Sequence, residues 1–298
     1  MDVGVIGLGS MGMGAALNLL RKGHAVTGCD LRETARVELQ LAGGRAVARA
    51  ADMPAGMGAL IVLVVNAAQA EDVLFGPDGC LPLLTPDAVV ICSTTLAPEA
   101  ARRIGARLDE HGIAMLDAPV SGGAAGARAG RMTVMASGPA TAFNRAQPVL
   151  DAIAGKVWRL GEAHGAGSTV KMVNQLLAGV HIAAAAEAMA LGIRAGADPQ
   201  TLFDVITTSA GNSWMFENRV PHVLAGDDTP LSSVNIFVKD LGIVLDQARA
   251  LTFPLPLAAA AHQLYLAAAA SGHGGADDAF VIRVWQALTG IKLPERKA

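Results

Sequence analysis

The sequence predicts an α/β domain with a mainly parallel, doubly wound sheet, followed by an all-α domain. Two observations support this division. Short, continuous apolar runs alternate with helical stretches through the first half, as is typical of parallel strands covered on both faces. After Leu160 the strand pattern stops, residues 161–167 are rich in glycine, and the periodicity is helical to the end. We therefore place residues 1–163 in the first domain and residues 164–298 in the second.

The elements follow from these patterns in order. Apolar runs of strand length lie at residues 3–6, 24–29, 60–65, 88–92, 113–117, 132–136 and 157–160. The second domain is expected to begin with a helix over residues 168–195. At about 28 residues this helix is long enough to run along the domain boundary.

The first apolar run leads directly into a glycine-rich turn that precedes a helical stretch. The turn reads Gly7-Leu8-Gly9-Ser10-Met11-Gly12. In such a turn the first glycine permits the tight bend, the second lets a pyrophosphate approach the backbone, and the third lets the helix pack on the sheet. The phosphates bind the N–H groups at the helix N-terminus. Because 34 of 298 residues are glycine, the motif alone is weak, but the strand before it and the helix after it indicate a Rossmann domain.

An acid, Asp30, ends the second apolar run and bears on the choice of cofactor. A carboxylate at this position accepts hydrogen bonds from the adenosine ribose hydroxyls and repels a 2′-phosphate. Arg32 can in principle bind such a phosphate, but we interpret it more simply as a solvated residue at the start of a helix. We therefore predict NAD rather than NADP.

Composition excludes several classes of function. The net charge of −3 and the 16% share of charged residues provide no basic surface for nucleic acid. The longest apolar stretches, residues 176–193 and 255–270, are interrupted by polar side chains, so no membrane span is expected. Because the first strand is expected within a few residues of Met1, we expect no secretion signal, and three cysteines without a CxxC pair favour a cytoplasmic location. The seven histidines show no metal-binding spacing, so no metal site is predicted.

A serine and two glycines follow the strand expected at residues 113–117 and therefore lie at the carboxyl edge of the sheet, where ligands bind. Ser121 offers a hydroxyl, while Gly122 and Gly123 can present consecutive N–H groups to an anion such as a carboxylate. The alternative is a flexible loop leading to residues 124–130, because Ser-Gly-Gly is common in turns.

Three hydroxyl residues, Ser93-Thr94-Thr95, end the strand expected at residues 88–92. They can donate to the substrate or to the nicotinamide amide. For Ser93 and Thr94 we favour the alternative that they cap the helix starting near Pro98.

Lys171, Asn174 and Gln175 stand at positions i, i+3 and i+4 of the first helix of the second domain, so their polar groups lie on one helical face. A lysine in an otherwise apolar helix needs a partner or a function. Its amine can exchange a proton with a substrate oxygen when desolvation brings its pKa into a useful range. The alternative is a lysine that extends to solvent beside two solvated amides. Farther along, Lys239 and Asp240 are compatible with a surface pair, and spacing does not decide their role.

The chain resembles the β-hydroxyacid dehydrogenases over essentially its whole length. Four ordered blocks carry the resemblance: residues 7–12, 117–123, 165–175 and 239–241. It implies a Rossmann domain, a long interdomain helix and a helical domain, paired in a homodimer or homotetramer. Within the family, residues 65–69 and 237–242 most resemble enzymes of four-carbon sugar-acid catabolism.

The resemblance also implies roles for individual residues. Lys171 is the expected catalytic residue, aided by Asn174 and Gln175, and Ser121, Gly122 and Gly123 hold the substrate carboxylate. Many members carry Asn where this chain has Gln175, which leaves its contact to the substrate hydroxyl open. The cofactor-binding residues implied are Gly7, Leu8, Gly9, Ser10, Met11, Gly12, Asp30, Leu31, Arg32, Val65, Asn66, Thr95 and Lys239.

The expected reaction is the NAD-dependent oxidation of a small hydroxy acid, with Lys171 taking the hydroxyl proton. Two alternatives are a semialdehyde reductase working towards the alcohol and a regulatory protein that binds NAD without catalysis. Alanine-rich stretches around residues 183–190 and 258–270 suggest helix faces that are too apolar for the surface of a monomer, which favours a homo-oligomer.

Overall fold

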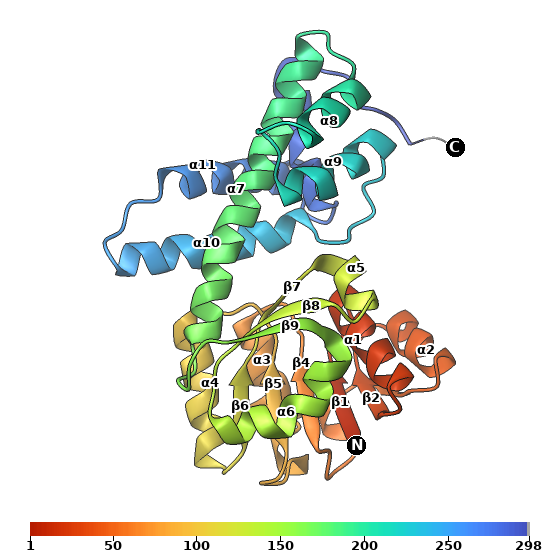
Figure 1. The fold of residues 1–298 in the computed structure, drawn as a ribbon, viewed down its shortest axis with the longest axis vertical. Coiled ribbons are helices and arrows are strands. Elements are labelled where there is room, and N and C mark those ends of the chain that lie inside the picture. The colour runs from red at the N-terminus through yellow and green to blue at the C-terminus, as the bar shows by residue number, and fades with distance from the viewer. Residues whose placement is uncertain (297–298) are drawn as a thin grey trace. The chain divides into compact units, whose positions relative to one another are not determined.

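The computed structural model describes residues 1–296 and divides into two units, Met1–Lys171 and Met172–Ala298. The first unit is built around a six-stranded parallel sheet with the strand order β3-β2-β1-β4-β5-β6, flanked by helices (Figure 1). This order reverses beside β1, as in dinucleotide-binding folds. The predicted Rossmann fold class is therefore confirmed.

The sheet strands are short and fully covered. In β1, Val3, Val5 and Ile6 are buried, and β1 pairs in parallel with both β2 and β4. The elements of this part are β1 (Asp2–Ile6), α1 (Ser10–Arg21), β2 (Ala25–Cys29), α2 (Glu33–Leu41), β3 (Arg45–Val47), β4 (Ala59–Val62), α3 (Ala67–Phe75), β5 (Val89–Cys92), α4 (Pro98–Glu110) and β6 (Ala114–Asp117).

A second, three-stranded sheet completes the first unit, with the order β7-β8-β9. Its elements are β7 (Val120–Ser121), α5 (Gly123–Arg128), β8 (Met132–Ala136), α6 (Ala140–Ile153) and β9 (Ala154–Arg159). The last two predicted strands thus form a separate sheet rather than extending the first one. Two strands, β3 and β7, were not predicted, because β3 spans only three residues and β7 only two, too few to show a periodicity.

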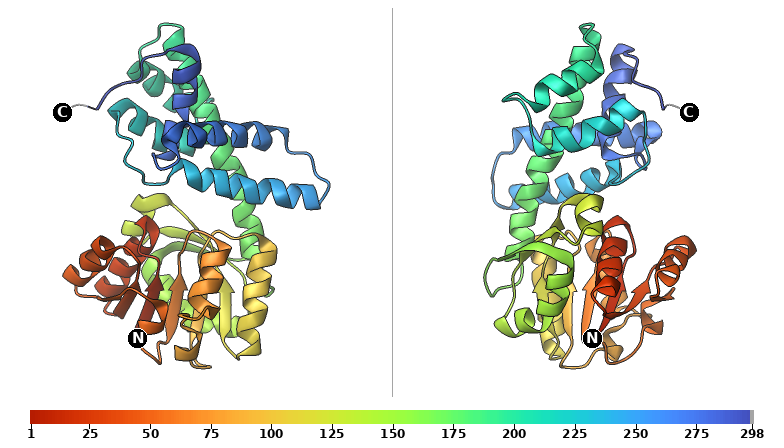
Figure 2. Two further views of the ribbon diagram at one scale, coloured as in Figure 1. Left: turned by 180° about the vertical axis from the view of Figure 1, so that it is seen from behind. Right: turned by 45° about the vertical axis from the view of Figure 1, so that its right-hand side comes forward.

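The second unit is helical, as predicted. Its helices are α7 (Ala166–Arg194), which begins in the first unit, α8 (Pro199–Thr207), α9 (Trp214–Ala225), α10 (Val234–Ala250), α11 (Pro256–Ala268) and α12 (Arg283–Thr289) (Figure 2). The longest, α7, has 29 residues and passes a length and hydropathy test for a membrane span, with a mean hydropathy of 1.8 in its most apolar window. Because its buried side chains belong to the core of the second unit, we assign α7 to that core.

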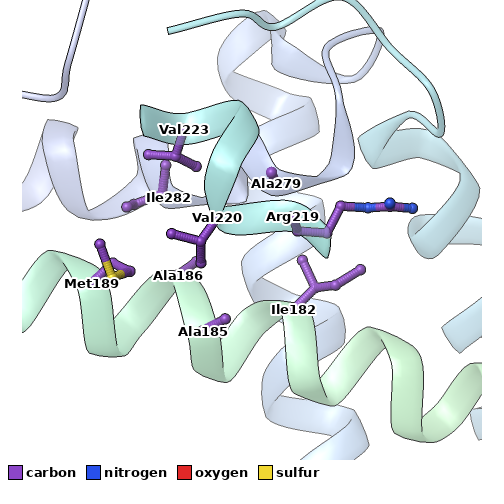
Figure 3. A pocket seen from close by; sticks show the side chains of 9 residues that line it. All are labelled: Ile182, Ala185, Ala186, Met189, Arg219, Val220, Val223, Ala279 and Ile282. Atoms are coloured by element: carbon purple, nitrogen blue, oxygen red, sulfur yellow. The ribbon is translucent and has the colours of Figure 1, made fainter. Parts of the chain in front are cut away.

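The core of the second unit includes a small apolar pocket, shown in Figure 3. The one polar side chain around it is Arg219, which donates to the buried carboxylate of Asp278 over 2.6 Å. The pocket is therefore a packing feature of the core and offers no chemistry to a substrate. Its lining residues are Ile182, Ala185, Ala186, Met189, Arg219, Val220, Val223, Ala279 and Ile282.

Candidate active site

The glycine-rich turn has the geometry that its sequence predicts. Gly7 has a φ of +91°, and a Cβ there would lie 2.3 Å from the carbonyl oxygen of Leu63. A Cβ at Gly12 would lie 1.8 Å from the carbonyl oxygen of Gly7, so the helix packs against the turn only without a side chain. A Cβ at Gly9, by contrast, would meet nothing within 4 Å. The turn thus fits a diphosphate, because it leaves open space above the N-terminus of α1, which no side chain caps.

Asp30, at the end of β2, is tied to this turn. Its Oδ2 accepts from the backbone N–H of Leu8 over 2.8 Å, and its carboxylate is also bound by the backbone and guanidinium of Arg32. Burial raises the pKa of Asp30, but the hydrogen bonds from Arg32 and Leu8 outweigh it, so the pKa falls below its usual value. Arg32 is solvent-exposed at the start of α2, as we interpreted it, and its guanidinium also ion-pairs with Asp30 over 3.0 Å.

The other expected cofactor residues of the first unit lie beyond the ends of neighbouring strands. Leu31 is exposed beside Asp30, and Val65 is half exposed after β4. Asn66 caps α3, with its Oδ1 accepting from the N–H of Gln69, whose Oε1 accepts from the N–H of Val65. This reciprocal cap fixes the turn that follows β4.

The hydroxyl residues after β5 do not cap the following helix. The N-cap of α4 is Ala97, so the expectation for Ser93 and Thr94 was wrong. The Thr94 hydroxyl instead donates to the carbonyl of Val62 and accepts from the N–H of Val64, which joins β5 to β4. The Ser93 hydroxyl is buried and has no partner among the described residues. Thr95 follows them, partly exposed, at the same edge of the sheet.

Ser121 ends β7, and the two glycines after it adopt conformations that favour glycine. Gly122 has a φ of +125° and Gly123 a φ of +61°. A Cβ at Gly123 would meet nothing within 4 Å, and in the described part of the chain neither glycine N–H donates a hydrogen bond. The segment therefore presents donors to open space, which suits an anionic group.

The structure adds a residue whose role was not predicted. Asp117, at the end of β6, is fully buried, and its carboxylate holds the start of α7. It accepts from the backbone N–H groups of Gly165 (3.0 Å) and Ser168 (2.8 Å) and from the Ser168 hydroxyl (2.7 Å). Burial raises the pKa of Asp117, although these hydrogen bonds oppose the rise. No local signal predicts this role, because the nearest of these partners lies 48 residues later in the chain.

Lys171 follows Ser168 in α7 and is only 6% exposed. Gly167, one turn earlier on the same face, packs so closely that a Cβ there would lie 2.5 Å from the carbonyl oxygen of Asp117. Asn174 and Gln175 continue this face, as their spacing predicts.

In the second unit, Gln175 meets α10. Its Nε2 donates to Asp240 Oδ2 over 2.6 Å, while its Oε1 accepts from Asn174 Nδ2 over 3.0 Å. Lys239 ion-pairs with the other carboxylate oxygen of Asp240. Asp240 is only 2% exposed, so the pair is not a surface pair. The sequence did not reveal that Asp240 is buried, because an adjacent lysine and aspartate are usually exposed to solvent.

The structure thus brings the predicted residues together in two groups. In the first unit, the turn at residues 7–12, Asp30 and the segments at 65–66 and 93–95 follow parallel strands of one sheet, so they share its carboxyl edge. In the second unit, Asn174, Gln175 and Lys239 are joined through Asp240.

Comparisons with known proteins agree with this architecture. Residues 2–161 match the family model described as the NAD binding domain of 6-phosphogluconate dehydrogenase. Residues 165–285 match the model described as NAD-binding of NADP-dependent 3-hydroxyisobutyrate dehydrogenase.

Relatives match the chain over nearly its full length. It is 59% identical to L-threonate dehydrogenase of Cupriavidus necator, covering 98% of each chain, and 53% identical to that of Escherichia coli K12, covering 99% of this chain and 97% of the relative. A crystal structure from Salmonella typhimurium, described as 3-hydroxyisobutyrate dehydrogenase, is 53% identical, with a TM-score of 0.92 and coverage of 95% and 99%. The chain therefore belongs to the β-hydroxyacid dehydrogenase family and is an NAD-dependent oxidoreductase.

Proposed function

We propose that the protein oxidises L-threonate at C2 with NAD, giving a 2-oxo acid that keeps its other hydroxyls. One observation carries the choice of substrate: five relatives named L-threonate dehydrogenase are 52–59% identical to this chain, whereas relatives named for 2-(hydroxymethyl)glutarate, for 3-hydroxyisobutyrate (from Pseudomonas aeruginosa) and for L-serine are 33–34% identical. The segments at residues 65–69 and 237–242 resemble the same enzyme.

The residues of the first unit supply binding and proton transfer. The substrate carboxylate binds Ser121 and the N–H groups of Gly122 and Gly123, whose positive φ angles expose them. Lys171 takes the proton from the C2 hydroxyl and returns it in the reverse direction. Burial suits this role, because it keeps the amine away from bulk water, where it can exchange a proton with the bound substrate.

The cofactor residues fit NAD. The turn at residues 7–12 holds the diphosphate, Asp30 binds the adenosine ribose, and Leu31, Arg32, Val65, Asn66, Thr95 and Lys239 complete the set. When bound, NAD supplies the acceptor for the hydride that leaves C2. The carboxylate of Asp30 already accepts hydrogen bonds from Leu8 and Arg32. For the ribose hydroxyls to bind this carboxylate, the Arg32 guanidinium must give up at least one of its hydrogen bonds to Asp30.

A second candidate is the oxidation of 3-hydroxyisobutyrate, favoured by the name given to the Salmonella protein at 53% identity. A reductase of tartronate or succinic semialdehyde type is less well supported, because reductive enzymes commonly use NADPH and Asp30 repels a 2′-phosphate.

The test is a dehydrogenase screen with the purified protein. We expect NADH formation with L-threonate to exceed that with 3-hydroxyisobutyrate and other three- and four-carbon hydroxy acids by at least about tenfold in kcat/KM. Faster turnover of 3-hydroxyisobutyrate, or of a semialdehyde with NADPH, would select the corresponding alternative. NAD binding without any turnover would select the regulatory protein.

We also propose that the protein acts in the cytoplasm as a homodimer or homotetramer. The stretch at residues 183–190 lies mostly within the core of the second unit, so it does not provide the apolar surface that we expected. Leu177, Leu191, Leu257 and Leu266 instead leave apolar side chains exposed on α7 and α11. Light scattering at micromolar concentration should give at least a dimer mass, and a monomer mass would contradict the proposal.

A further inference from the structure

We propose that Asp240 and Gln175 are positioning residues that set the direction of the Asn174 amide, so that its oxygen accepts a hydrogen bond from the C3 hydroxyl of the substrate, next to the C2 hydroxyl that gives its proton to Lys171. The inference rests on the proposed function for the identity of the substrate. It assigns Gln175 a different role from a direct contact with the substrate.

The direction of the network follows from Asp240. Paired with the Lys239 ammonium, this side chain is a carboxylate, and a carboxylate only accepts hydrogen bonds. The Gln175 amide must therefore turn its Nε2 donor towards Asp240, over 2.6 Å. Its Oε1 then faces Asn174, so Asn174 presents its Nδ2 donor, over 3.0 Å. One charged group thus fixes two amides that would otherwise flip freely.

The result is a defined acceptor. With Nδ2 committed to Gln175, the other end of the Asn174 amide is Oδ1, and no hydrogen bond within the described residues uses that oxygen. Asn174 is partly exposed and stands three residues after Lys171 on the same face of α7. The C2 hydroxyl gives its single proton to Lys171, so the Asn174 oxygen accepts instead from the neighbouring C3 hydroxyl and thereby orients C2 for the reaction.

The hydrogen bonds of this network lie where α7 packs closely against α10. One turn beyond Gln175, a Cβ at Gly179 would lie 3.0 Å from Leu241 and from Phe237 of α10. The Tyr265 hydroxyl donates to the Gly179 carbonyl over 3.0 Å, and its ring stacks on Phe237. Because α7 and α10 pack this closely, they have little room to move together when the reach from Gln175 to Asp240 changes. A glutamine spans it, and an asparagine would fall short by about 1.5 Å.

The test shortens the side chain at position 175 by one methylene group and lengthens the side chain at position 240 by one. Gln175→Asn and Asp240→Glu each change the reach, and we expect kcat/KM for L-threonate to fall by about 10- to 100-fold in each. The double variant Gln175→Asn/Asp240→Glu restores the summed length and should recover at least about tenfold over the worse single variant. Asp240→Asn keeps the shape but can donate as well as accept, so kcat should also fall.

Two further measurements separate positioning from stability. The kcat/KM for 2,4-dihydroxybutanoate, which lacks the C3 hydroxyl, should change less than about threefold in all variants, because this acid offers no donor to the Asn174 oxygen. The thermal midpoint is recorded for each. The matched control is Gln200→Asn/Asp204→Glu on α8, where an exposed Gln200 donates to Asp204 over 2.9 Å. Its single and double variants should leave turnover unchanged.

Additive losses in the double variant, or wild-type kcat/KM in Asp240→Asn, would overturn the inference. So would an equal loss of kcat/KM for 2,4-dihydroxybutanoate. If the wild-type protein prefers another hydroxy acid, the proposed substrate fails, and the same variants are measured with that acid and its deoxy analogue. The positioning role is then decided independently.

Discussion

Asp117 and Asp240 are both buried aspartates that bind α7, but they bind it in different ways. Asp117, in the first unit, accepts from the backbone and hydroxyl at the start of the helix. Asp240, in the second unit, shares its charge with Lys239 and binds a side chain of the helix. A carboxylate that satisfies backbone donors supports folding, whereas one that holds a side-chain amide sets the direction of a functional group. We expect loss of Asp117 to lower stability and loss of Asp240 to lower turnover.

The largest effect is expected at Lys171, which lies on α7 between the helix start that Asp117 binds and the amide that Asp240 binds. Lys171→Ala should slow single-turnover NADH formation by about 10²–10⁴-fold, since positioned acid–base catalysis contributes that much. The Kd for NAD should change little, because the phosphates bind residues 7–12. Lys171→Arg should rescue little, because guanidinium does not release its proton near neutral pH. Near-normal turnover in folded Lys171→Ala would refute the catalytic role of Lys171 and, with it, the functional role that we assign to Asp240.

The second-largest effect is expected at Asp117, the aspartate to which we assign a role in stability. Asp117→Ala leaves the N–H groups of Gly165 and Ser168 and the Ser168 hydroxyl without their acceptor, so we expect the free energy of unfolding to fall by about 2–4 kcal/mol. Urea unfolding measures this loss, with Asp240→Asn measured beside it. If Asp240→Asn proves the more destabilising of the two, the division between structural and functional aspartates is wrong.

A third acid extends the comparison to the cofactor. Asp30 resembles Asp240 in its ion pair, and it should likewise act through function. Asp30→Asn should raise the Kd for NAD by about 10- to 150-fold, because charge-assisted hydrogen bonds contribute about 1.5–3 kcal/mol. The selectivity for NAD over NADP should fall as well. Arg32→Ala removes the ion pair but keeps the carboxylate, so the Kd for NAD should rise less than in Asp30→Asn. A wild-type Kd that is lower for NADP than for NAD would refute our interpretation of Asp30.

The smallest effect is a difference in pH dependence. The folded-state pKa of Asp117 lies above its usual value of 3.8, so the folded protein binds more protons than the unfolded chain between that value and the raised pKa. The contribution of Asp117 to the free energy of unfolding should therefore fall as the pH rises through this window. The difference between wild type and Asp117→Asn should shrink accordingly.

Asp30 gives the opposite sign for this measurement. Its pKa is lowered, so its contribution is present above pH 3.8 and is lost as the pH falls. Parallel stability curves for wild type and both asparagine variants would contradict the two assignments.

The sequence by itself determined the fold class, the glycine turn, the acid at the end of β2 and the grouping of Lys171, Asn174 and Gln175 on one helical face. These are local features: a run of apolar residues, a fixed glycine spacing or a helical period is complete within about 30 residues of chain. The four blocks of the family resemblance are also local, which is why they could be found in order.

The tertiary structure decided what depends on distant partners. The carboxylate of Asp117 meets Ser168 across 51 residues, and Gln175 meets Asp240 across 65. The ion pair of Arg32 with Asp30 is close in sequence, yet it depends on how the chain turns after β2. For Asp117 and Asp240 the physical reason is burial: a carboxylate that packing removes from water must find hydrogen-bond partners, and only the fold determines which partners those are.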